Sequence, residues 1–139
     1  MVHTYDPKQV AVTIGGQSAS GFGDGTFVKF GRMEPMWNMK VGVDGEATRA
    51  KSNNKSGFIE ITLMNSSSFN AYLSGITQAD ELSNNGAVPC LVNDKSGTDL
   101  ATCLTGWVKQ WPDREKAKEA NTTTWRIETD NLQIFIGGN

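Results

Sequence analysis

Few residues of this chain belong to the types that usually carry out catalysis or bind metals. The 139 residues include one histidine, His3, and two cysteines, Cys90 and Cys103. A Ser-His-Asp or Cys-His site would have to recruit His3 from the N-terminal segment. A zinc site needs three or four Cys or His ligands, and these three residues lack ligand spacing. We therefore expect no catalytic site, no cofactor and no metal site.

The two cysteines belong to a predicted hairpin. Strands are expected at 88–93 and 100–108, with the turn centred between Ser96 and Gly97. That centre places Cys90 opposite Cys103, and cross-strand neighbours are close enough to touch. We expect two small buried thiols. The alternative is a disulfide that forms after cell lysis.

Two glycine-containing motifs suggest ligand binding but lack essential parts. The run Gly21-Phe22-Gly23-Asp24-Gly25 lacks the Lys-Ser/Thr pair of a phosphate loop, and no helix follows it. We expect a tight turn there. Asp44-Gly45-Glu46 lacks the further oxygen ligands of a calcium loop. Asp and Glu number 15, but nothing in their placement indicates an acid–base pair. We therefore expect a protein that is not an enzyme.

Aromatic and cationic residues alternate near the C-terminal third, as they do in proteins that bind single-stranded nucleic acid. They are Trp107, Lys109, Trp111, Arg114, Lys116 and Lys118. Asp113, Glu115 and Glu119 lie among them and cancel the charge. We therefore expect a core tryptophan on a strand followed by a solvated, charged turn.

The overall composition favours an acidic globular domain. Formal net charge is −2 and the sequence pI is about 5.3, whereas proteins that grip nucleic acid usually have a basic excess. Hydrophobic residues make up 37 % of the chain, enough for one core in one domain spanning 1–139. The chain has no apolar run of membrane-spanning length and no signal peptide at its start. We expect no membrane partner and synthesis in the cytoplasm.

Hydrophobic periodicity predicts a mainly β chain with one helix. Apolar residues at Phe69, Leu73 and Ile76 indicate a helix over about 68–81, with an N-cap within 66–68 and a stop at 83–86. The charged segment 113–121 is expected to form a solvent-facing helical turn. The fold class predicted is an antiparallel β-sandwich or barrel with one flanking α-helix. The predicted strands are 10–14, 26–33, 36–43, 58–63, 88–93, 100–108, 122–129 and 132–136, the last two forming a second hairpin across Asp130-Asn131.

A polar segment at about 42–56 joins two predicted strands and has almost no apolar residue to bury. A compact domain rarely carries an unstructured loop of about 15 residues unless the loop has a function. Because no group on it could do chemistry, we expect an arm that contacts other copies of the chain. It should be disordered in a monomer and ordered in an assembly.

The chain resembles tail tube proteins of contractile-tailed phages. The order and spacing of several motifs, running through most of the chain, carry this resemblance. The motifs are V-x-V-x-I-G-G at Val10 to Gly16, Gly21-Phe22, the Asp24-Gly25 turn, Val43-Asp44-Gly45-Glu46 with Arg49, Ser56-Gly57 leading into Ile59 to Leu63, Ser67 or Ser68 with Asn70 and Leu73, Trp107 to Pro112, and Ile136-Gly137-Gly138-Asn139.

This resemblance implies a structural subunit. Six copies would form a ring around a continuous inner β-barrel, and the rings would stack into a tube inside a contractile sheath. The tube would conduct DNA into the host. The implied partners are other copies of the chain, the sheath protein, baseplate and tail terminator proteins at the ends, and the tape-measure protein and transiting DNA in the lumen. The implied location is the tail of the virion, assembled in the host bacterial cytoplasm.

The resemblance also suggests two sets of candidate residues. Candidate inter-subunit contacts are Asp44, Glu46, Arg49, Lys51 and Lys55. Candidate lumen-facing residues lie on the strands that flank the polar segment: Glu60 and Thr62, or Asn38 and Lys40. Three alternatives stay open: a tube subunit of a bacteriocin or secretion machine, a tube initiator or terminator, and a small ligand-binding β-barrel.

Overall fold

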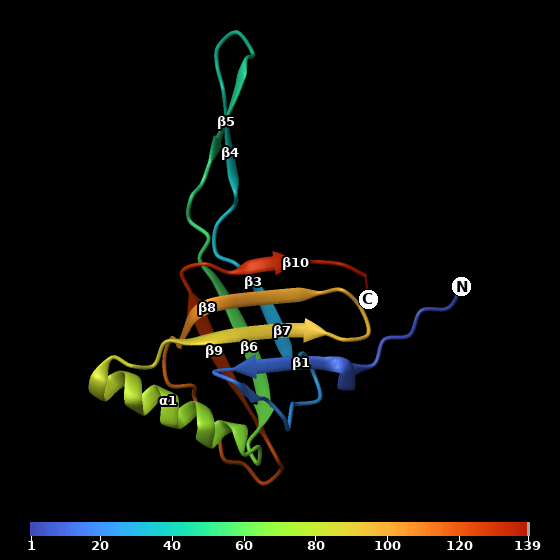
Figure 1. Cartoon of the computed structure of the whole chain (residues 1–139), viewed down its shortest axis with the longest axis vertical. Helices are drawn as coiled ribbons and strands as arrows, with labels where there is room; N and C mark the ends of the chain where they lie inside the picture. The colour runs from blue at the N-terminus through green and yellow to red at the C-terminus, as the bar shows by residue number, and fades with distance from the viewer. Residues whose placement is uncertain (139) are drawn as a thin grey trace.

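The computed structural model describes residues 1–138 and shows a β-rich body from which one hairpin stands out (Figure 1). Asn139, the last residue of the terminal motif, lies outside the described residues. A 3-10 turn, η1 (Pro7–Gln9), precedes the first strand. The other elements are β1 (Val10–Ile14), β2 (Gln17–Ser18), β3 (Val28–Arg32), β4 (Trp37–Val41), β5 (Ala47–Lys51), β6 (Gly57–Met64), α1 (Phe69–Ser83), β7 (Val88–Asp94), β8 (Leu100–Val108), β9 (Thr122–Thr129) and β10 (Gln133–Phe135).

The body is one eight-stranded antiparallel sheet that folds over on itself. Its strand order is β2-β1-β7-β8-β9-β6-β3, and β10 pairs with β8 beside this path. The end strands β2 and β3 do not pair with each other, so the sheet is not closed into a barrel. The prediction of mainly antiparallel β-structure with one helix is confirmed, and the sheet is open.

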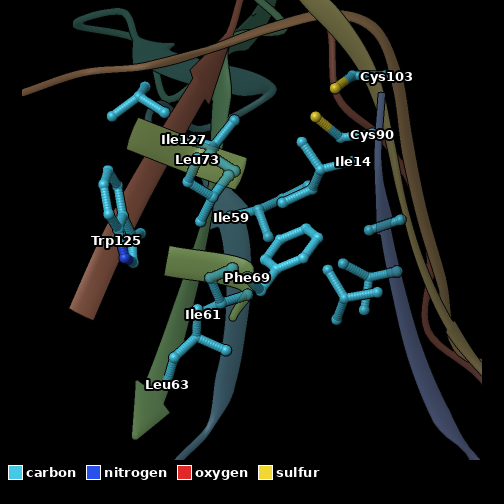
Figure 2. Close-up of a cluster of buried hydrophobic side chains, with 14 of the residues drawn as sticks. Ile14, Ile59, Ile61, Leu63, Phe69, Leu73, Cys90, Cys103, Trp125 and Ile127 are labelled. Atoms are coloured by element: carbon cyan, nitrogen blue, oxygen red, sulfur yellow. The ribbon is translucent and has the colours of Figure 1, made fainter. Parts of the chain in front are cut away.

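The core lies between the two walls of this folded sheet. Strand β6 alternates strictly, and Ile59, Ile61 and Leu63 are at most 1 % exposed. They face Ile14 and other residues of β1, β7 and β8 across the core (Figure 2). Burying a large aliphatic side chain stabilises a fold by about 1.5–3 kcal/mol. These alternating strands therefore account for much of the stability of the body.

Helix α1 covers one end of the core, close to its predicted position. Ser68 is the N-cap but makes no side-chain capping bond, and the neighbouring Ser67 hydroxyl accepts a hydrogen bond from the Phe69 N–H at 3.2 Å. At the other end Asn84 adopts a left-handed conformation with φ of 56°, and its N–H donates to the Asp80 carbonyl. Phe69 and Leu73 are buried as the periodicity predicted.

A buried amide, which the sequence reasoning missed, joins α1 to the sheet. The Asn70 side-chain nitrogen donates to the Met64 carbonyl at 3.0 Å and to the Ser67 carbonyl at 3.1 Å. Its oxygen accepts from the indole N–H of Trp125 at 2.9 Å. No buried side-chain polar atom among the described residues lacks a hydrogen-bond partner. Asn70 therefore joins the helix to the sheet without leaving a buried polar group unsatisfied.

The predicted register of the cysteine hairpin is confirmed. Cys90 on β7 pairs directly with Cys103 on β8, and both are buried free thiols. Their sulfur atoms point toward each other (Figure 2). The hydrogen bond with Cys103 and burial both raise the pKa of the Cys90 thiol above its ordinary value.

Two predictions near the C-terminus were wrong. Strand β10 pairs with Leu100–Thr102 of β8 and not with β9. The reason is that both edges of β9 are already occupied, one by β6 and the other by Gly106–Val108 of β8. The segment 113–121 is an exposed loop with no helical turn. It has no apolar face to pack, and short isolated helices are marginal in water.

Candidate functional site: the hairpin arm and the outer sheet face

The most prominent surface feature is a hairpin, residues 33–56, that we call the arm. Strands β4 and β5 pair from Trp37 with Lys51 to Val41 with Ala47, and they stand away from the body (Figure 1). The prediction that 42–56 is an unstructured loop was therefore wrong, because β5 lies within it. The apolar alternation occurs on β4 alone, so the sequence showed only one of the two strands.

The tip of the arm is a tight turn built by Asp44 and Gly45. The Gly42 N–H donates to the Glu46 carbonyl at 2.8 Å, and the Asp44 carboxylate accepts from the Glu46 N–H at 3.2 Å. Gly45 has φ of +88°, a conformation that favours glycine. Asp-Gly between two extended runs is a recognised hairpin signal, and it could have identified β5 from the sequence.

The root of the arm joins it to the adjacent body strands β3 and β6. The Met33 N–H donates to the Ser56 carbonyl at 3.1 Å, and the Ser52 N–H donates to the Met36 carbonyl at 2.8 Å. Arg32 pairs with Gly57 at the edge of the body, and Trp37 pairs with Lys51 at the base of the arm. Between these two pairs the outgoing chain advances five positions and the returning chain six. The register therefore shifts by one residue where the arm leaves the body.

The arm has two unlike faces, because residues that pair across a ladder lie on the same side. The apolar face carries Trp37, Met39 and Val41 with their partners Lys51, Arg49 and Ala47. The polar face carries Asn38 and Lys40 with Ala50 and Thr48. All ten residues are exposed.

The apolar face has no core to cover it. Met39 is 73 % exposed, Val41 56 % and Trp37 40 %. The guanidinium carbon of Arg49 lies 3.8 Å from the centre of the Trp37 ring, a cation–π contact. Exposed apolar side chains gathered on one element are typical of a protein–protein contact surface.

The five candidate contact residues occupy three parts of the arm. Asp44 and Glu46 form the tip, and Arg49 and Lys51 lie on the apolar face. Lys55 lies at the root, where its carbonyl accepts from the Leu132 N–H at 2.9 Å. Four of the five are therefore on the projecting part, while the Lys55 backbone is tied to the body.

The two candidate lumen sets lie on different surfaces. Asn38 and Lys40 are on the polar face of the arm. Glu60 and Thr62 alternate with the buried residues of β6 and therefore belong to its outer face. There Thr62 and Thr124 share a hydrogen bond of 3.0 Å between their hydroxyls. The two alternative sets therefore lie on different surfaces of the molecule.

Arg126, which the sequence reasoning missed, organises the outer face of β6 and β9. It donates to Glu60 at 2.7 Å and to Glu128 at 3.1 Å, and it lies 4.2 Å from the Phe58 ring centre. Burial opposes its charge, but the hydrogen bonds with Glu128 and Glu60 outweigh burial and raise the pKa of the guanidinium. The charges of this face are therefore largely paired.

An apolar groove of about 520 Å³ lies at the root of the arm. Phe30, Gly31 and Arg32 of β3 line one side, and Ile134 and Ile136 at the C-terminal strand line the other.

Within residues 1–138, no three His, Cys, Asp or Glu side chains are grouped closely enough to hold a metal ion. No helix in the same range is long and apolar enough to cross a membrane.

Comparisons with known proteins give one family and one sequence relative. The family model described as bacteriophage PhiTE tail tube protein matches residues 2–137. The chain is also similar to structural protein ORF10 of Pseudomonas phage KPP10. The two are 26 % identical over 144 residues, covering 98 % of this chain and 83 % of the phage protein.

Two solved structures share the fold at low sequence identity. One is the tube-terminating cap of the anti-feeding prophage, with a TM-score of 0.61, 10 % identity, and coverage of 97 % of this chain and 93 % of that one. The other is the sheath/tube terminator of PVC, an extracellular contractile injection system, in the extended state. It has a TM-score of 0.61, 8 % identity, and coverage of 97 % and 99 %. At these identities the likeness concerns the fold alone.

Proposed function

The chain belongs to the phage PhiTE tail tube protein family, and from that premise we propose that it is the repeating subunit of a tail tube. The family is structural, so the chain is a non-enzymatic protein of the phage tail. In the proposal six copies form a ring, and the rings stack into a hollow tube inside a contractile sheath. The tube conducts DNA into the host cell.

The exposed apolar face of the arm is the observation that carries this proposal. A two-stranded hairpin is at best marginally stable alone in water, and this one exposes Trp37, Met39 and Val41. Contact with another copy would remove these side chains from water. Repeated head-to-tail contacts along one axis produce a polymer. Asp44, Glu46, Arg49 and Lys51 are the proposed contact residues, with Lys55 anchoring the root.

The outer face of β6 and β9 is the proposed lumen wall. Arg126 there is bonded to Glu60 and Glu128, and Lys109 lies 3.6 Å from Glu128. Non-specific DNA affinity comes mainly from protein cations that bind phosphates and so release the counterions of DNA. Because the cations of this wall already bind carboxylates, the wall should bind DNA weakly. DNA could then pass without being held. Asn38 and Lys40 on the arm are the alternative lining.

The other proposed partners surround the tube. They are the sheath protein outside, baseplate and tail terminator proteins at the ends, and the tape-measure protein and DNA in the lumen. Assembly in the host bacterial cytoplasm belongs to the same proposal. A related tube of a bacteriocin or a secretion machine would use the same subunit contacts.

A tube terminator or initiator is the second candidate function. Both solved structures described above are tube-terminating proteins, although a shared fold does not transfer their role. Such a protein forms a ring that does not extend. The small ligand-binding barrel is disfavoured, because the sheet is open and core side chains fill the space between its walls.

Electron microscopy and sedimentation of the purified chain over a range of concentrations test the proposal. A tube subunit gives rings at low concentration and tubes of variable length at high concentration. Single rings that never extend would support a terminator or initiator instead. A monomer under every condition would rule out both candidates.

A further inference from the structure

The end of α1 lies in the half of the molecule away from the arm (Figure 1). Its exposed positions include Gly75, Gln78 and Ala79, followed by Glu81 and Leu82 in the last turn. Leu82 is 88 % exposed in the last turn. If copies stack along the long axis in one orientation, the arm of one copy points toward the half of the next copy that carries α1, whose last turn lies at the side of the body (Figure 1).

The last turn of α1 lacks a cation. Asp80 and Glu81 lie there, no basic residue does, and the helix C-terminus is itself electronegative. Asp80 accepts from the Gly86 N–H at 3.2 Å, and Glu81 accepts from the Trp111 indole N–H. Both donors are neutral, and neither carboxylate takes part in an ion pair within residues 1–138.

The apolar face of the arm offers the complementary groups. Met39 and Val41 supply apolar contact, while Arg49 and Lys51 supply two cations on the same face. Within the described part of the chain, neither cation forms an ion pair with a carboxylate. The Trp37 ring beneath Arg49 already limits the freedom of its guanidinium, so less conformational entropy is lost on contact.

We propose that the arm of one copy docks against the C-terminal half of α1 in the next copy, with the apolar face on Leu82 and with Arg49 and Lys51 facing Glu81 and the helix end. This inference rests on the proposed tube function. The apolar groove at the arm root is not the receiving surface in this arrangement. It lies at the same end as the arm and is available to a lateral neighbour.

Photo-cross-linking identifies the receiving surface directly. A benzoylphenylalanine placed at Met39 on the apolar face should cross-link assembled copies to residues 78–83 of a neighbour. The same group at Thr48, on the polar face, is the control and should give at least tenfold less of that product. Tubes that form with cross-links elsewhere would overturn the docking inference alone. Failure to form any ring or tube would overturn the proposed function as well.

Two leucines of matched exposure test the apolar contact. Leu82→Asp should still form rings but should convert them to tubes at least tenfold less efficiently. Leu104→Asp on β8 is the control, since Leu104 is 87 % exposed but lies outside the proposed contact. Equal losses of ring-to-tube conversion in the two variants would contradict the inference.

A charge exchange tests the ionic part. Arg49→Glu should lower ring-to-tube conversion at least tenfold, because it brings like charge to the end of α1. Adding Glu81→Arg should recover part of that loss. The melting temperature of each unassembled variant controls for loss of the Trp111 hydrogen bond. A double variant no better than Arg49→Glu alone, with the fold intact, would overturn the pairing.

Discussion

The arm and the body contain the same alternation of apolar residues but place it in opposite surroundings. On β6 the alternating residues Ile59, Ile61 and Leu63 are at most 1 % exposed. On β4 Trp37 is 40 % exposed and Met39 is 73 % exposed. Alternation therefore identifies which side of a strand is apolar. Whether that side is buried depends on whether another part of the fold packs against it, as the opposite wall of the sheet does for β6.

The two regions also differ in what stabilises them. The body has eight strands and a helix around one core. The arm has two strands, one cation–π contact and the hydrogen bonds of its root. Substitutions in the body should therefore change folding, and substitutions in the arm should change assembly. The three predictions below test this contrast, beginning with the largest effect on stability.

Leu73→Ala should lower the free energy of unfolding by about 2–5 kcal/mol, because it opens a cavity under α1. Leu73 is fully buried, whereas Leu82 on the same helix is 88 % exposed. Leu82→Ala is therefore the matched control and should change stability by no more than about 0.5 kcal/mol. Urea denaturation of unassembled protein measures both, and similar losses would refute the assignment of the buried face.

Asn70→Ala should lower the free energy of unfolding by about 1–3 kcal/mol, because it leaves the buried Trp125 indole N–H without its acceptor and removes the side-chain bonds to the Met64 and Ser67 carbonyls. Gln78→Ala, on the exposed side of the same helix, serves as the control. Denaturation followed by tryptophan fluorescence gives the values. A loss below about 0.5 kcal/mol would show that water or another side chain replaces the amide.

Arg49→Ala and Glu46→Ala should each change the free energy of unfolding by no more than about 0.5 kcal/mol, because exposed arm residues support no core. Both should nevertheless impair the stacking of rings. Thr48→Ala, on the polar face, should affect neither property. Thermal melting of the monomer and electron microscopy of assembled samples separate the two effects. Loss of monomer folding in either variant would mean that the arm belongs to the core.

Sequence reasoning succeeded where a residue pattern has one physical explanation. The alternation at Val10 to Ile14 and Phe58 to Leu63 predicted β1 and β6, and the helical spacing of Phe69 and Leu73 predicted α1. The turn at Ser96-Gly97 predicted the pairing of Cys90 with Cys103. In each case the local pattern determines the structure because the core requires one face to be apolar.

The failures concern information that a local pattern does not carry. Strand β10 was assigned the wrong partner because pairing depends on which edges other strands already occupy. Strand β5, Ala47–Lys51, has no large apolar residue and was read as loop. The structural role of Asn70 was missed, because its buried partner Trp125 lies 55 residues along the chain. The contact and lumen residues stay predictions, since they concern surfaces between copies.

The connection of the arm to the body has a mechanical consequence. Each arm strand is covalently continuous with a neighbouring body strand, β4 with β3 and β5 with β6, and β6 pairs along its whole length with β9. A pull on the arm tip is thus shared by two neighbouring strands, β3 and β6, and the hydrogen bonds between the paired strands together resist sliding. The subunit can therefore pass tension from the arm into its sheet through two neighbouring strands.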